Sequence, residues 1–142
     1  MTIYFASDHA GNSLRQTLLA YVKAAGHDVI DLGPEEMTSV DYPDFGVKLA
    51  MALKQDHAGR GIAICGSGIG ISIALNRLSW VRAALVSQPE AAKLARRHND
   101  ANVLILGART LGIEIARDCL GAFLDTEFEG GRHQRRVDKM SG

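Results

Sequence analysis

The sequence has 142 residues, a length typical of one domain, so we expect residues 1–142 to form a single unit. Its 16 Lys and Arg balance 16 Asp and Glu, and this zero net charge argues against a general nucleic-acid-binding protein. There is no apolar run of the roughly 20 residues that cross a bilayer, and no secretory signal at the N-terminus. Two cysteines do not suggest a disulfide framework, so we expect a cytoplasmic protein with no membrane partner.

Short apolar runs alternate with segments of helical period along the chain. The apolar runs predict five strands, at 3–6, 29–30, 61–65, 81–86 and 103–106. The periodic segments predict five helices, at 13–25, 43–55, 68–78, from within 87–90 to 99, and at 111–124. The alternation and the continuous apolar strands predict an α/β domain, a three-layer α/β/α sandwich with a five-stranded, parallel, Rossmann-like sheet.

Polar residues and glycines follow three of the predicted strands. Ser7-Asp8-His9 follow the first strand, Cys65-Gly66-Ser67 the third, and Gly107-Ala108-Arg109 the fifth. In open parallel sheets, ligands bind beyond the carboxyl ends of the strands, so we expect the site at that edge. His98 and Asn99 lie instead in the connection before the fifth strand.

The stretch Cys65-Gly66-Ser67-Gly68-Ile69-Gly70 is the richest candidate for anion binding. Its glycines allow backbone N–H groups to turn toward a phosphate or an oxyanion. The spacing excludes a dinucleotide fingerprint and a cysteine-phosphatase loop, because Ile71 occupies the position of the last glycine in one and of the arginine in the other. A phosphate-binding NTPase loop is excluded because no Gly-Lys-Ser/Thr is present. A plain strand-to-helix turn remains the alternative.

Cys65, at the start of the glycine turn, favours a functional role for the turn over a plain connection between strand and helix. The partial positive charge of a helix N-terminus stabilises a thiolate, which can act as a base or a nucleophile. The alternative is a small buried apolar residue, the commoner role of a lone cysteine. Cys119 is the example of that role, because it continues a helical apolar stripe from Leu111 and Ile115.

The remaining polar candidates have open alternatives. Asp8 can be a ligand or a turn carboxylate, and His98 a site residue or a surface cap near a helix C-terminus. No Cys and His set has the spacing of metal ligands, so we expect no metal. In the tail, residues 125–142, Arg132 and Arg136 are spaced i, i+4 and face one way if helical, which suits a phosphate dianion. The alternative for this basic segment is a solvated surface.

The motifs together resemble the ribose/galactose isomerase (LacAB/RpiB) family. Six of them occur in the order of that family and cover essentially the whole chain, at residues 8–11, 41–43, 65–70, 98–100, 107–109 and 130–136. The resemblance implies reversible isomerisation of an aldose and a ketose sugar phosphate, typically ribose 5-phosphate and ribulose 5-phosphate, through an enediolate, with no organic cofactor and no metal.

The resemblance also implies roles for individual residues. Cys65 matches the base that moves a proton between C2 and C1, and His98 matches the residue that opens the sugar ring. The anion hole corresponds to Gly66, Ser67, Gly68, Ile69 and Gly70, with the Ser67 hydroxyl close to the chemistry. The other substrate contacts are implied to be Asp8, His9 (near the phosphate), Tyr42, Asn99, Arg109, Arg132 and Arg136.

Two further implications concern base and assembly. Relatives with a glutamate base carry it at the position of Leu75, so this chain belongs with the cysteine-base group. The family forms homodimers or tetramers whose sites are shared between subunits, with the tail, residues 125–142, contributing. The open alternatives are another substrate (allose 6-phosphate, galactose 6-phosphate or a tetrose 4-phosphate) and a non-catalytic module that binds a phosphosugar without turning it over.

Overall fold

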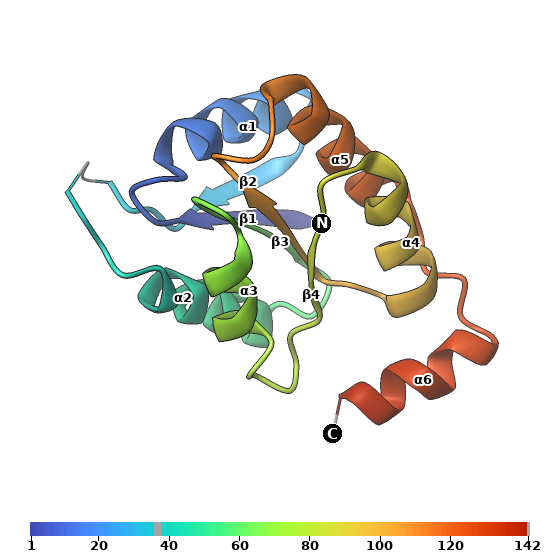
Figure 1. Ribbon diagram of the computed structural model, residues 1–142. Helices are drawn as coiled ribbons and strands as arrows, with labels where there is room; N and C mark the ends of the chain where they lie inside the picture. Colours follow the sequence, from blue (N-terminus) through green and yellow to red (C-terminus); the bar gives the residue numbers. More distant parts are fainter. Residues whose placement is uncertain (36–37, 142) are drawn as a thin grey trace.

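The computed structural model describes residues 1–35 and 38–141. Five strands and five helices alternate along them, and a sixth helix follows the last of these (Figure 1). The strands are β1 (Thr2–Ser7), β2 (Asp28–Asp31), β3 (Arg60–Cys65), β4 (Ala83–Leu85) and β5 (Val103–Gly107). The helices are α1 (Asn12–Ala24), α2 (Tyr42–Gln55), α3 (Ile69–Leu75), α4 (Pro89–Asn99), α5 (Ile113–Asp125) and α6 (Arg132–Met140).

The strands form one parallel sheet in the order β2-β1-β3-β5-β4, which confirms the predicted α/β fold. The alternating side chains of each strand fill two separate cores. Ile3, Ile62 and Leu104 point toward α1, α4 and α5, whereas Ala63 and Ile105 point toward α2 and α3. Crossovers in one direction along the sheet therefore use one face and those in the other direction use the opposite face, as right-handed connections require.

Three elements differ from the prediction by two or more residues at one end. Helix α3 ends at Leu75, because the side-chain amide of the next residue, Asn76, bonds both the N–H and the C=O of Ala83 at 2.9 Å. Strand β4 is shorter than expected because the N–H of Arg82 donates to the side chain of Asn102. Helix α5 begins at Ile113, two residues late, after Gly112.

The tail forms the helix on which the arginine prediction depended. Positive φ angles at Gly130 (68°) and Gly131 (55°) turn the chain into α6, which lies outside the three layers beside the end of α4 (Figure 1). Cys119 is fully buried on α5, as predicted, and burial raises the pKa of its thiol. Among the described residues, no helix is long and apolar enough to cross a membrane.

Candidate functional site

The order of the strands reverses beside β1, because β2 lies on one side of it and β3 on the other. Such a switch point leaves a crevice at the carboxyl ends of the strands. Asp8 follows β1 and Cys65 ends β3, so both lie at this crevice. We call Asp8, His9, Tyr42, Cys65–Gly70 and Arg109 the Cys65 cluster.

Cys65 is only 4% exposed, and its Sγ accepts a hydrogen bond from the N–H of Gly68 at 3.2 Å. Gly68 has φ 79°, a left-handed conformation that places this N–H beside the sulfur. The next N–H, of Ile69, donates to the Ser67 hydroxyl at 3.1 Å. The turn thus directs a backbone N–H at the Cys65 sulfur, and the Ser67 oxygen retains its own proton for donation.

The loop after β1 is held beside Cys65. The N–H of Asp8 donates to the C=O of Ile64 at 3.2 Å, and its Oδ1 accepts from the N–H of Gly11 at 3.0 Å. Asp8 therefore has the turn role that the sequence left open, at a position next to the thiol. His9 is exposed, and its Nδ1 accepts from the N–H of Val40 at 3.1 Å, which leaves Nε2 as the protonated nitrogen.

Tyr42 and Arg109 form the sides of the glycine turn. A Cβ added to Gly70 would lie 2.5 Å from the Tyr42 ring, so the ring packs directly on that glycine. A Cβ at Gly66 would lie 3.5 Å from the Arg109 guanidinium, and the backbone N–H of Arg109 donates to the C=O of Gly66 at 2.8 Å. The turn therefore has an aromatic wall on one side and a cation on the other.

The remaining predicted site residues lie at the opposite edge of the sheet. His98 and Asn99 end α4, which delivers the chain to the start of β5, whereas Cys65 pairs with Gly107 at the end of β5. The strand from Val103 to Gly107 spans roughly 13 Å at about 3.3 Å per residue. One copy of the chain therefore does not bring His98 to Cys65. We call His98, Asn99, Arg132 and Arg136 the His98 cluster.

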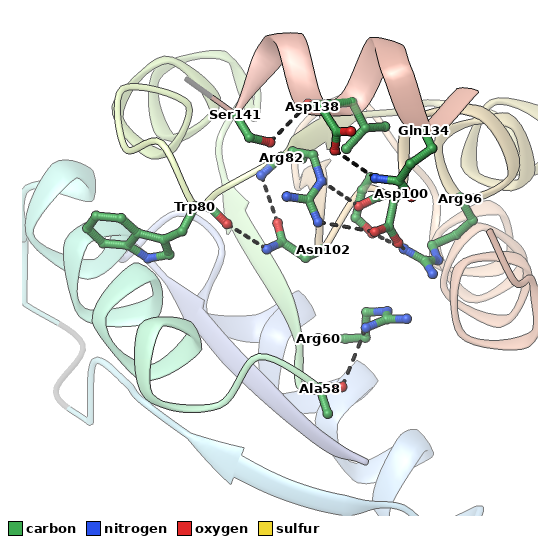
Figure 2. A network of polar contacts seen from close by, with 12 residues as sticks. Ala58, Arg60, Trp80, Arg82, Arg96, Asp100, Asn102, Gln134, Asp138 and Ser141 are labelled. Carbon is green, nitrogen blue, oxygen red and sulfur yellow. Dashed lines mark hydrogen bonds and ion pairs between the residues drawn. The ribbon is translucent and has the colours of Figure 1, made fainter. Parts of the chain in front are cut away.

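A network of charges fixes the turn after His98 and Asn99 (Figure 2). Asp100 has φ 46°, and its carboxylate joins Arg96 at 2.9 Å and Arg82 at 3.3 Å. Arg96 is buried and also donates to the C=O of Ala101 at 2.6 Å and of Thr126 at 3.2 Å. It thereby ties the end of α4 to the start of the tail.

The tail returns to His98 through Glu129. The N–H of Glu129 donates to the C=O of Arg97 at 3.1 Å, and its Oε1 lies 3.6 Å from Nε2 of both His98 and His133. The two imidazole rings stack, with centroids 4.4 Å apart and planes inclined by 14°. Burial lowers the pKa of His133, and nearby cationic groups such as Arg132 lower it further.

His98, Glu129 and His133 each have an atom that could bind a metal ion, and these atoms lie within 4.8 Å of one another. The spacing of the three residues in the sequence does not reveal this proximity. The nitrogen lone pairs of an imidazole lie in the ring plane, so nearly parallel stacked rings direct them side by side. A zinc ion requires ligands that converge tetrahedrally. The arrangement therefore suits two rings that share one carboxylate better than a metal centre.

Three supporting residues escaped the sequence analysis. Arg15 of α1 is fully buried, and it donates to the Ser7 hydroxyl at 2.6 Å and the Pro34 C=O at 2.7 Å, with Asp31 at 3.1 Å. Its position in the buried stripe of the helix was a usable signal, because an arginine there needs partners. Glu129 and His133 gave no such signal, since only the fold brings them to His98.

Comparison with known proteins gives one consistent result. The family model described as Ribose/Galactose Isomerase matches residues 3–140. Ribose-5-phosphate isomerase B of Escherichia coli (strain K12) is 41% identical over 139 residues, which cover 98% of this chain and 93% of the relative.

Solved structures agree with the sequence relatives. Ribose-5-phosphate isomerase B of Clostridium thermocellum superposes with a TM-score of 0.96 at 46% identity, covering 99% of this chain and 95% of that one. The Mycoplasma genitalium enzyme, solved with bound ribulose 5-phosphate, has a TM-score of 0.95 at 41% identity, covering 99% and 93%. These relatives span nearly the whole length of the chain.

Proposed function

The chain belongs to the ribose/galactose isomerase family, and on this premise we propose that it interconverts ribose 5-phosphate and ribulose 5-phosphate. It is an intramolecular aldose–ketose isomerase. The observation that carries the proposed mechanism is the buried Cys65 thiol, held against the glycine turn by the N–H of Gly68 at the switch point of the sheet.

We assign proton transfer between the sugar carbons to Cys65. Its thiolate takes the proton from C2 of the open-chain aldose, the electron pair forms the C1–C2 double bond, and the carbonyl oxygen becomes an enediolate oxygen. The thiol then returns a proton to C1 while the O2 hydroxyl proton moves to O1, which gives the ketose. A positioned base of this kind contributes roughly 10²–10⁴-fold.

The Gly66–Gly70 backbone and the Ser67 hydroxyl are assigned to the developing enediolate oxygen. Donors that are already aimed at such a charge are worth about 3 kcal/mol each, because they need no reorganisation during the reaction. Asp8 lies beside the thiol with one oxygen committed to Gly11, so the other is assigned to a sugar hydroxyl. The Nε2–H of His9 is suited to a phosphate oxygen, because Nδ1 is engaged by Val40.

Ring opening is assigned to His98, and substrate and phosphate binding to Asn99, Arg109, Arg132 and Arg136. Because His98 and Cys65 lie at opposite edges of the sheet, these roles require a second copy of the chain. We therefore propose a homodimer in which the Cys65 cluster of one subunit meets the His98 cluster of the other. A two-fold axis then creates two identical composite sites.

Open surfaces beside each cluster support this assembly. An apolar hollow of about 450 Å³ beside the Cys65 cluster is lined by Tyr42, Gly70 and Ile73, among others. A hollow of about 370 Å³ beside the His98 cluster lies between Ala84 of β4 and Met140 of α6, and it includes Asn99. Ile69, Ile73 and Val47 expose about half of their surface, which a second copy would cover.

The test of the substrate is a comparison of kcat/KM for ribose 5-phosphate, allose 6-phosphate, galactose 6-phosphate and a tetrose 4-phosphate. We expect the highest value for ribose 5-phosphate. A higher value for a hexose or tetrose phosphate would mean that the chain is an isomerase of that sugar phosphate and not of ribose 5-phosphate.

We also assign the enzyme to the cytoplasm, where the two free cysteines stay reduced.

A further inference from the structure

Glu129 lies beside His98, the residue to which we assign ring opening, but it is not one of the residues assigned to substrate binding. Its carboxylate lies 3.6 Å from His98 Nε2, and its backbone N–H is fixed on Arg97, the residue before His98. The same oxygen lies 3.6 Å from Nε2 of the buried His133, four residues later on α6. Two elements therefore fix the position of Glu129. Helix α4 holds its backbone through Arg97, and His133 of α6 lies against its carboxylate.

A carboxylate can only accept hydrogen bonds, whereas a neutral imidazole carries a proton on one nitrogen and a lone pair on the other. The carboxylate beside both Nε2 atoms therefore favours the tautomers with the proton on Nε2. In His98 this leaves Nδ1 as the nitrogen that can accept a proton. The stacked ring of His133 covers one face of His98 and limits its rotation.

We propose that Glu129, supported by His133, is a positioning residue that keeps His98 in the Nε2-protonated tautomer with Nδ1 available to the sugar. The inference rests on the proposed role of His98 in ring opening. It adds a carboxylate and a second histidine that act through His98 without touching the reacting atoms. Residues that orient a functional imidazole in this way typically change activity by 10–100-fold when removed, by analogy with metal-bound histidines.

The first test reads the tautomer directly. Nitrogen-15 NMR of the histidine side chains, with His98 assigned by its substitution, should show a protonated Nε2 and an unprotonated Nδ1 in the wild-type enzyme. Glu129→Ala should produce a mixture of both tautomers. Glu129→Gln should retain more of the original, because an amide oxygen facing Nε2 can accept a hydrogen bond from a protonated Nε2. An Nδ1-protonated His98, or a tautomer that Glu129→Ala leaves unchanged, would overturn the proposal.

The second test separates ring opening from proton transfer. Isomerisation that starts from ribose 5-phosphate needs the ring to open, whereas ribulose 5-phosphate, whose O5 carries the phosphate, cannot form a furanose. Glu129→Ala should lower kcat for ribose 5-phosphate about tenfold with KM nearly unchanged. Exchange of the C1 hydrogen of ribulose 5-phosphate with solvent, which needs Cys65, should continue at the wild-type rate. An equal loss of both would contradict a role through His98.

The matched control is Glu127→Ala, which removes an exposed carboxylate two residues away in the same tail. It should retain wild-type kcat and the wild-type tautomer of His98; an equal loss would mean that tail charge, and not position, matters. His98→Asn separates the two proposals. If His98→Asn keeps full activity, the ring-opening role fails, while the NMR result still decides whether Glu129 sets the tautomer.

Discussion

The Cys65 cluster and the His98 cluster are built in different ways. Cys65 and Asp8 are 4% and 7% exposed, and backbone hydrogen bonds from neighbouring strands and the glycine turn hold them in place. His98 is 41% exposed, and it lies against the Glu129 carboxylate and the stacked ring of His133, both from the tail. The sheet itself preorganises the first cluster, whereas the second depends on charged side chains and, in our proposal, on a second subunit to complete the site.

This difference predicts which substitutions affect chemistry and which affect binding. Groups fixed by the sheet suit proton transfer, where small displacements are costly. Long exposed arginines on α6 suit a phosphate, which is bound by charge and tolerates adjustment. Removing the Cys65 thiol should therefore lower kcat, whereas removing an arginine of the His98 cluster should mainly raise KM.

The largest effect is expected for Cys65→Ala. Removal of the base should lower kcat by roughly 10²–10⁴-fold while KM for ribose 5-phosphate changes little. Steady-state kinetics measure this change. Cys119→Ala is the control, because the Cys119 side chain is buried in the hydrophobic core beneath α5. Its loss should reduce thermal stability without lowering kcat. A Cys65→Ala enzyme with full activity would exclude the thiol as the base.

Arg136→Ala should raise KM about tenfold, the effect of losing one charge-assisted contact, and leave kcat nearly unchanged. The neighbouring Arg135→Ala removes an equal charge from an exposed position on α6 that the i, i+4 pair does not include. It should leave KM close to the wild-type value. If the two variants behave alike, general charge attraction replaces the specific phosphate contact.

A smaller effect is expected for Gly70→Ala. The added methyl group would lie 2.5 Å from the Tyr42 ring, so the ring must move away from the glycine turn. KM should rise several-fold because the wall of the pocket shifts. Gly121→Ala on α5 is the matched control, since nothing lies within 4 Å of its Cβ position. Gly121→Ala should raise the free energy of unfolding by about 0.5–1 kcal/mol and leave KM unchanged. An unchanged KM in Gly70→Ala would contradict the assignment of Tyr42 to the substrate pocket.

The sequence was sufficient to predict the layers and the sheet, because the apolar runs and helical periods are regular. It was less reliable where a side chain ends an element. Asn76 stops α3 by bonding β4, and a local pattern does not contain that long-range contact. Helix α6 was not among the five predicted helices, because no apolar stripe marks it; the spacing of its arginines only indicated that they share a face if the segment is helical.

The two clusters were predictable to different extents. Asp8, Cys65 and Arg109 follow strands, so the topology of a parallel sheet placed them at one edge. His98 was known only to precede the last strand, and its distance from Cys65 became clear once the register paired Cys65 with Gly107. Glu129 and His133 could not be placed near His98, because that contact depends on the turn at Gly130 and Gly131.

The central claim, that two subunits share each site, is tested most directly by mixing two inactive variants. Cys65→Ala and His98→Asn damage different clusters, so a mixed dimer has one doubly damaged site and one intact site. Coexpression in equal amounts should restore about a quarter of wild-type activity, because half of the dimers in a symmetric two-site assembly are mixed. Activity that stays at the level of the separate variants would contradict the shared site.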